Sequence, residues 1–151
     1  MPQSLARVAI HIVFGTKHRR PWLDDVSLSE ELYAYMATVL KANDSPAVVI
    51  GGAADHVHTL CVLSRKVTIA KLVEEMKTGP SKWIKTKGPE FRDFHWQAGY
   101  GVFSVSESKL IDVRRYIESQ RQHHERMTFQ DEYRQLCERH GLPVDERYAW
   151  D

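Results

Sequence analysis

The stretch of residues 47–63, AVVIGGAADHVHTLCVL, predicts a β-hairpin around which the rest of the fold is organised. Its two halves, 47–51 and 56–63, are rich in Val, Ile, Leu and Thr, and the residues between them are typical of a tight turn. In the second half, His56 and His58 are separated by one apolar residue. Alternate residues of a strand point to the same face, so both imidazoles are expected to project together.

Strands and helices alternate on both sides of this hairpin. Residues 5–16 predict a buried strand, and residues 27–41 carry apolar positions at the helical period. Thr68 opens a second amphipathic helix, which Gly79-Pro80 is expected to kink or locally break because proline removes a backbone donor. The remaining predicted elements are a strand and a turn within 91–103, a strand at 102–105, and helices over about 108–126 and about 128–140.

This order, β-α-β-β-α-β followed by two helices, predicts an α+β fold. An antiparallel sheet with helices on one face, plus the C-terminal helices, forms a ferredoxin-like split βαβ sandwich. A chain of 151 residues is long enough to bury a core, and no repeat or linker divides it. We therefore expect a single domain over residues 1–151.

The composition is typical of a soluble globular protein, with 42% hydrophobic and 27% charged residues. No apolar run approaches the ~20 residues needed to cross a bilayer, and the first residues lack the order of a secretory signal. The two cysteines, Cys61 and Cys137, make no disulfide framework. We expect a cytoplasmic protein without a membrane partner.

Basic residues gather locally, although the net charge is only +1. Lys17, Arg19 and Arg20 form one cluster, and Lys82 and Lys85 belong to a lysine-rich helix. Such clusters either contact the phosphates of a nucleic acid or form an ordinary solvated surface, and the pattern alone favours neither.

A second set of polar side chains lies on the predicted helix 108–126. Tyr116 and Gln120 are four residues apart, so the phenol and the amide share one helical face. His123 or His124 follows on roughly the same face, where a solvated surface is the plain alternative. Brought against the strand histidines, Tyr116 and Gln120 would complete a three-ligand metal site beside a tyrosine nucleophile. That arrangement is suited to cutting a phosphodiester chain.

Several motifs in chain order resemble the single-tyrosine transposases of the two-hundred/six-hundred-and-five insertion-sequence group. These belong to the HUH enzymes, which are named for a histidine-hydrophobic-histidine motif. The Asn-Pro that usually follows the tyrosine in the subgroup associated with repeated palindromes is replaced here by Ser119-Gln120. The segments that carry the resemblance are His11 to Phe14, Thr16 to Pro21, Asp55 to His58, Lys77 to Lys82, Phe94 to Ser106, and Tyr116 to Gln120 with His123 and His124.

The resemblance implies a transposase that cleaves single-stranded DNA and transfers the strand. It implies that His56, His58 and Gln120 hold a divalent metal ion, Mg²⁺ or Mn²⁺, while Tyr116 attacks the scissile phosphate to form a 5′-phosphotyrosine. No nucleotide cofactor is implied, because the covalent bond conserves the cleaved linkage. The candidates for supporting positions around the metal are Asp55, His123 and His124.

The implied partners are single-stranded DNA hairpins at the ends of a mobile element, bound by a homodimer. A bacterial, nucleoid-associated location in the cytoplasm is expected, and the resemblance leaves open whether Tyr116 acts in its own subunit or in a partner. The candidates for phosphate contacts are Lys17, Arg19, Arg20, Lys82 and Lys85.

Three alternatives remain beside this hypothesis. The first is a domesticated, non-mobile protein of the same fold that binds or nicks hairpin DNA, against which the intact candidate catalytic residues argue. The second is a replication initiator of the same motif class, which the short chain and the full-length resemblance disfavour. The third is a metal-free ferredoxin-like interaction module.

Overall fold

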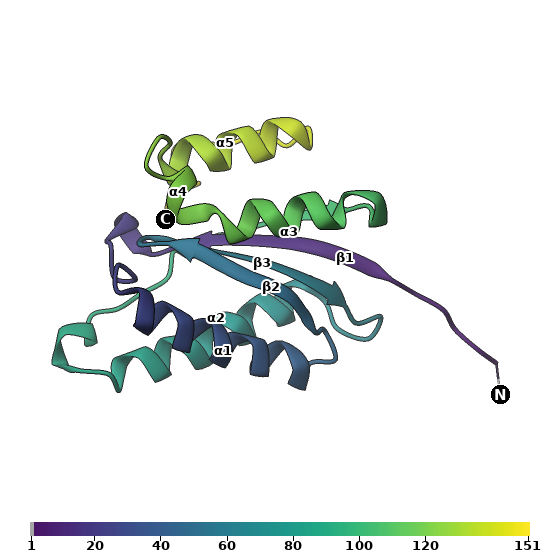
Figure 1. The fold of residues 1–151 in the computed structure, drawn as a ribbon, viewed down its shortest axis with the longest axis horizontal. Coiled ribbons are helices and arrows are strands. Elements are labelled where there is room, and N and C mark those ends of the chain that lie inside the picture. Colours follow the sequence, from purple (N-terminus) through teal and green to yellow (C-terminus); the bar gives the residue numbers. More distant parts are fainter. Residues whose placement is uncertain (1) are drawn as a thin grey trace.

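The computed structural model describes residues 2–151 and has the expected element order (Figure 1). The strands are β1 (Val8–Gly15), β2 (Ala47–Ala53), β3 (His56–Leu63) and β4 (Gly101–Val105). The α-helices are α1 (Val26–Ala42), α2 (Ile69–Lys85), α3 (Leu110–Glu118), α4 (Gln120–His123) and α5 (Phe129–Arg139). Short 3-10 helices lie in the connections: η1 (Lys17–Arg19), η2 (Pro89–Phe91) and η3 (Glu107–Lys109).

The sheet confirms the predicted α+β fold. Its strands run in the order β2-β3-β1-β4, and each neighbouring pair is antiparallel. Helices α1 and α2 cover one face of the sheet, whereas α3, α4 and α5 lie over the other face (Figure 1). The C-terminal helices therefore add a third layer to the split βαβ sandwich, and β3 lies between the two helical layers.

Alternation along the strands separates two hydrophobic clusters, one on each face of the sheet. Ile12 and Phe14 of β1 pack in the larger cluster with α1 and α2, whereas Val13 between them packs against α5. The smaller cluster holds α5 over the strands. Its buried members are Val13, Phe103, Phe129, Tyr133, Leu136 and Cys137.

The single helix predicted over 108–126 is divided in the structure. Helix α3 ends at Glu118, and the next residue, Ser119, has φ −99° and ψ 16°, outside regular helical geometry. The Ser119 hydroxyl donates a hydrogen bond to the Tyr116 carbonyl at 3.2 Å, which competes with continued helical bonding. Because the Ser119 hydroxyl bonds this carbonyl of the last turn of α3, the chain can leave α3 and begin α4.

Two further local predictions differ from the structure. Helix α2 continues through Pro80 rather than breaking, and Pro80 is buried within the helix. The strand expected early in 91–103 is η2 followed by loop, with one isolated bridge between Thr16 and Trp96. The aromatic side chains of this segment pack into the larger core cluster instead, where Phe94 lies edge-on to Trp96.

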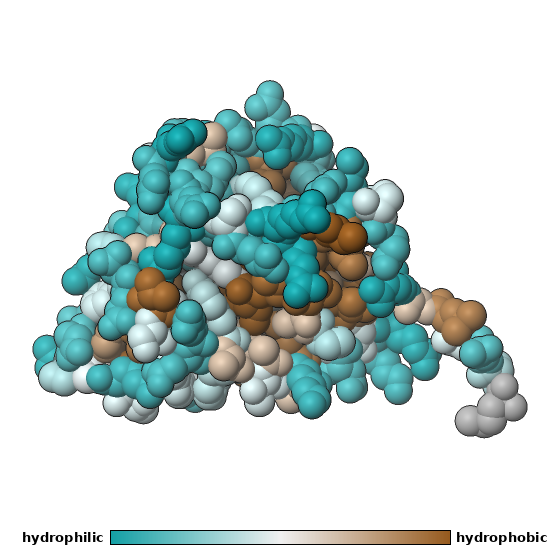
Figure 2. Space-filling model, in the orientation of Figure 1, coloured by the Kyte–Doolittle hydropathy of each residue, from teal (hydrophilic) through white to brown (hydrophobic). Residues whose placement is uncertain are grey.

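One edge of the sheet is partly exposed. β2 is an outer strand, and its residues 47–50 are only half-buried. Figure 2 shows hydrophobic side chains gathered between the two helical layers, where Figure 1 places β2. Within residues 2–151, no helix combines the length and apolar character needed to span a bilayer.

The close approach of α3 to β2 depends on Gly51. A Cβ added at Gly51 would lie 2.5 Å from the backbone oxygen of Ile117, so alanine would force α3 away from the sheet. We expect Gly51→Ala to lower the free energy of unfolding by about 1–3 kcal/mol in urea denaturation. Gly99→Ala is the matched control, because its Cβ would meet only the Gln97 side chain, at 3.8 Å. Equal midpoints for the two variants would contradict this account.

Candidate active site

The two histidines of the hairpin lie at the start of β3, on the face covered by the C-terminal helices. Both side chains are fully buried, and the intervening Val57 belongs to the core cluster of the opposite face. Pairing with β1 holds the strand in register, with Gly15 opposite His56 and Val13 opposite His58. The two imidazoles therefore project together toward α3, α4 and α5.

Tyr116 and Gln120 approach the histidines from the helical layer of the same chain. Tyr116 lies in the last turn of α3, and Gln120 begins α4 after the break at Ser119. The Gln120 Oε1 atom lies 3.0 Å from Nε2 of His56, and the Tyr116 ring centroid lies 5.7 Å from that of His58. The four residues predicted to act together are thus neighbours within one chain.

Glu132 of α5 lies at the centre of this group and was missed by the sequence analysis. Its carboxylate is almost fully buried, and its Oε1 accepts a hydrogen bond from Nε2 of His58 at 2.8 Å. Its Oε2 accepts hydrogen bonds from the Tyr116 hydroxyl and from the Gln120 amide. The sequence signal that could have identified Glu132 is its position on the apolar face of a predicted helix. A buried carboxylate needs hydrogen-bond or ion-pair partners, so an acid in that position points to a polar site. The buried residues of α5 are Phe129, Glu132, Tyr133, Leu136 and Cys137.

The two strand histidines are each oriented by a second side chain. The Nδ1–H of His56 donates to Oδ1 of Asp55 at 2.7 Å, and Nδ1 of His58 shares a hydrogen bond of 2.7 Å with Nε2 of His11. Such contacts fix the tautomer and the ring orientation of a metal-binding imidazole. Asp55 lies where a supporting residue was predicted, and His11 was not singled out for this position.

The tandem histidines after α4 differ in their contacts. His124 reaches the centre, with its Nε2 3.0 Å from Oε1 of Gln120 and 3.1 Å from Oε1 of Glu132. His123 lies at the side, with Nε2 3.4 Å from the other Glu132 oxygen. Among the contacts of residues 2–151, this buried His123 nitrogen has no hydrogen-bond partner.

Burial sets the protonation of the inner imidazoles. It lowers the pKa of His58 to about 4. Burial also lowers the pKa of His11 to about 3, and the neighbouring His58 adds to that effect. Both rings are therefore neutral at pH 7, which is the state in which an imidazole binds a metal ion.

The pKa of the Tyr116 phenol and the pKa of the Glu132 carboxyl group are shifted in opposite directions. Burial, followed by the charge of Glu132, raises the pKa of Tyr116 above its ordinary value. Burial acts to raise the pKa of Glu132 as well, but hydrogen bonds from His124 and His58 hold that pKa well below its usual range. Without a metal ion, the site thus holds an ionised carboxylate against a protonated phenol.

The acceptors around His56 fit a bound cation. Its Nδ1–H donates to Asp55, so Nε2 is the ring atom that faces the site. The facing atom is Oε1 of Gln120, whose amide orientation is fixed because Nε2 of Gln120 donates to Glu132. Nε2 of His56 and Oε1 of Gln120, 3.0 Å apart, can therefore both bind one cation.

Comparison with known protein families shows which family the chain belongs to. The family described as transposase IS200 like matches residues 4–120, which is 117 of the 151 residues. The chain belongs to this transposase family. No protein of curated function matches the transposase in sequence.

Solved structures share the fold of this transposase. A candidate transposase from Deinococcus radiodurans has a TM-score of 0.62 at 22% identity, over 80% of this chain and 96% of that one. A REP-associated tyrosine transposase bound to a REP hairpin has a TM-score of 0.50 at 12% identity, over 78% of this chain and 67% of that one. At such low identity the similarity establishes the fold alone.

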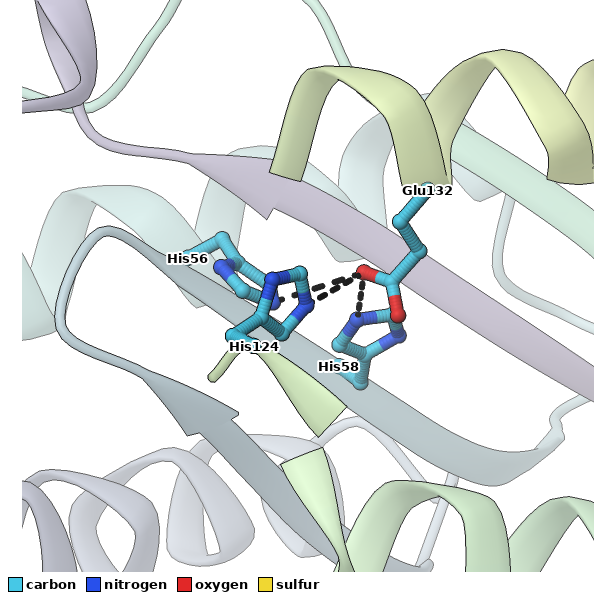
Figure 3. Close-up of side chains that lie close together, drawn as sticks. All are labelled: His56, His58, His124 and Glu132. Carbon is cyan, nitrogen blue, oxygen red and sulfur yellow. Dashed lines mark hydrogen bonds and ion pairs between the residues drawn. The ribbon is translucent and has the colours of Figure 1, made fainter. Parts of the chain in front are cut away.

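The transposase carries a histidine and glutamate group that can hold a divalent metal ion. Figure 3 shows the rings of His56, His58 and His124 gathered around the Glu132 carboxylate. One ligand atom from each of these residues lies within 4.8 Å of the others. The group combines β3, the end of α4 and α5.

A cavity of about 610 Å³ lies beside Tyr116, between β4, α3 and α5. Tyr116 and His11 form part of its wall, together with apolar side chains such as Phe103 and Leu136 and with polar ones. The charged side chains in its lining are Lys109, Arg139 and Asp112. The cavity gives an extended ligand room to reach the phenol.

The predicted phosphate contacts fall into two groups. Lys17 and Arg19 lie in η1, and the next residue, Arg20, lies over the Trp22 ring at 4.3 Å. This cluster adjoins the active-site hairpin, because the amide of Thr16 donates to the carbonyl of Asp55 at 2.8 Å. The other pair, Lys82 and Lys85, is exposed on α2, on the far side of the sheet from Tyr116 (Figure 1).

Proposed function

We propose that this transposase cleaves and rejoins single-stranded DNA through a covalent bond between Tyr116 and a 5′-phosphate. The observation that carries the proposal is the convergence of Tyr116 and the three predicted metal ligands on Glu132 within one chain. A phenol beside two imidazoles and a carboxamide supplies a nucleophile and a cation-binding set together.

In the proposed reaction, the phenolic oxygen of Tyr116 forms a bond to phosphorus while the bond from phosphorus to the 3′-oxygen breaks. Tyr116 loses its proton and the departing oxygen gains one, so the products are a 5′-phosphotyrosine and a free 3′-hydroxyl. Attack by another 3′-hydroxyl reverses these bond changes and joins a new strand without a nucleotide cofactor. Before the attack, Oε2 of Glu132 holds the phenolic hydrogen and thereby orients the hydroxyl.

His56, His58 and Gln120 would hold the divalent ion, Mg²⁺ or Mn²⁺. Bound there, the ion would polarise the scissile phosphate and stabilise the charge that develops on it. The protein contributes orientation, since Asp55 and His11 fix the two imidazoles from behind. Both rings are fully buried, which holds them in place.

The proposed substrate is a single strand folded into hairpins at the ends of a mobile element, bound by a homodimer. The cluster Lys17, Arg19 and Arg20 suits this substrate because it adjoins the active-site hairpin and includes a cation stacked on Trp22. Lys82 and Lys85 would meet DNA only where it passes behind the sheet. One structural relative is described as bound to a REP hairpin, which supports this class of substrate.

The test is formation of a covalent adduct. Full-length protein is mixed with Mn²⁺ and single-stranded DNA that carries an imperfect palindrome from the DNA flanking its own gene, and the products are separated on a denaturing gel. We expect a denaturant-resistant protein–DNA band that EDTA abolishes. Binding of the hairpin without any adduct would contradict cleavage and would favour a domesticated binding protein.

Salt dependence tests the basic cluster. For the triple variant Lys17→Gln, Arg19→Gln, Arg20→Gln, we expect weaker hairpin binding by fluorescence anisotropy. The slope of log Kd against log salt should fall by about 2, since each phosphate contact to a single strand contributes roughly 0.7. The control variant is Lys41→Gln, Lys66→Gln, which removes two exposed lysines elsewhere. An unchanged slope in the triple variant would exclude these residues as phosphate contacts.

A further inference from the structure

The sequence after the family match supplies two donors to the position where a cation is proposed. The match ends at Gln120, whereas His124 follows α4 and Glu132 lies in α5. Both side chains nevertheless point to the same centre as the strand histidines (Figure 3). The family similarity therefore assigns no role to either residue.

His124 is oriented as a metal ligand is. Its Nδ1–H donates to the carbonyl of Met127 at 2.6 Å, which leaves Nε2 as the ring atom directed at the centre of the site. The facing atoms are Oε1 of Gln120 and Oε1 of Glu132, and both are acceptors. The geometry at His56 is the same, with Asp55 in the place of the carbonyl. A metal ion at this centre would take the place of the proton through which His124 otherwise donates to Glu132.

The spacing of the donor atoms fits one coordination shell. Two ligands at right angles on an ion with bonds of about 2.1 Å are about 3.0 Å apart. Oε1 of Glu132 lies 2.8 Å from the His58 nitrogen, 3.1 Å from that of His124 and 3.5 Å from that of His56. Oε1 of Gln120 lies 3.0 Å from the nitrogens of both His56 and His124. Four of these five separations lie within 0.2 Å of the value for neighbouring positions of an octahedron, and the separation between Glu132 and His56 is longer.

We propose that His124 and Glu132 complete the metal shell, which then selects Mn²⁺ over Mg²⁺. The shell comprises three imidazoles, one carboxamide and one carboxylate, and it leaves one octahedral position for a phosphate oxygen. Mg²⁺ prefers oxygen ligands and keeps its bound water, whereas transition metals such as Mn²⁺ accept imidazole ligands more readily. The proposal rests on the proposed function only for the position of the cation. A consequence is that metal binding ties α5 to the sheet.

Calorimetric titration with MnCl₂ and MgCl₂, without DNA, measures the affinity of the proposed site for each metal. We expect the unaltered protein to bind Mn²⁺ at least about 10-fold more tightly than Mg²⁺. Glu132→Gln and His124→Ala should each weaken Mn²⁺ binding by about 10–100-fold. Glu138→Gln, an exposed acid on the same helix, is the matched control and should bind normally. Equal affinity for the two metals would overturn the selectivity, and unchanged or tighter Mn²⁺ binding by Glu132→Gln would exclude the carboxylate as a ligand.

Hydrogen exchange on the unaltered protein keeps the proposal testable if a variant fails to fold. We expect Mn²⁺ to slow amide exchange in residues 129–139 relative to EDTA, because a bound ion would hold α5 against β3. Unchanged exchange there, at a Mn²⁺ concentration that saturates the titration, would overturn the proposal. Neither measurement depends on DNA cleavage, so a protein that binds Mn²⁺ as expected but forms no adduct would contradict only the proposed function.

Discussion

Tyr116→Phe is expected to abolish the covalent protein–DNA adduct while leaving hairpin binding unchanged. Phenylalanine keeps the ring that packs edge-on to His11 and His58, so the fold and the DNA surface should persist. The variant removes only the oxygen that would bond to phosphorus. Loss of a nucleophile should reduce cleavage by about 10⁴-fold or more. The adduct is measured on a denaturing gel, and binding is measured by fluorescence anisotropy.

The control for this variant is Tyr148→Phe, which alters an exposed tyrosine distant in sequence from the site. It should form the adduct at the normal rate. Persistence of the adduct in Tyr116→Phe would show that another residue attacks the phosphate. Simultaneous loss of hairpin binding would instead show that the hydroxyl serves recognition, and the nucleophile assignment would no longer stand.

His58→Ala is expected to abolish Mn²⁺ binding and to reduce cleavage by about 10²–10⁴-fold. His58 is fully buried and neutral at pH 7, and it contacts Glu132 on one side and His11 on the other. Its removal takes away one metal ligand and also leaves two buried polar groups short of a partner. We therefore expect a lower melting temperature in EDTA as well as a loss of metal affinity.

Two measurements separate these effects. Calorimetry with MnCl₂ at a temperature well below melting reports the ligand role, and thermal unfolding in EDTA reports the structural role. His95→Ala, in an exposed loop position before β4, is the control for loss of an imidazole. A folded His58→Ala protein that cleaves with unaltered Mn²⁺ dependence would exclude His58 from the metal site.

The histidine face of the hairpin could be predicted because the two-residue period of a strand is a local property. Val57 joins one core and its neighbours His56 and His58 face the other helical layer, as alternation requires. The four-residue spacing of Tyr116 and Gln120 brought both to the site even though Ser119 ends the helix between them. Local periodicity thus predicted which side chains share a face, whereas the meeting of the strand and the helix was implied only by the resemblance.

Glu132 could not be placed because its position depends on distant parts of the chain. Helix α5 is held by contacts with Val13 of β1 and Phe103 of β4, and no local pattern predicts such pairings. The same applies to Lys77, which carried the resemblance within α2. Its ammonium donates to the carbonyls of residues 97, 98 and 99, so in the structure it holds the loop before β4.

The cavity beside Tyr116 lies along β4, which is one border of the sheet, whereas the half-exposed β2 is the opposite border. A nucleotide chain that reached Tyr116 through this cavity would not contact β2. Access to Tyr116 and the exposed edge at β2 can then be altered independently of each other. A small molecule bound between Phe103 and Leu136 would accordingly block access to Tyr116 without covering β2.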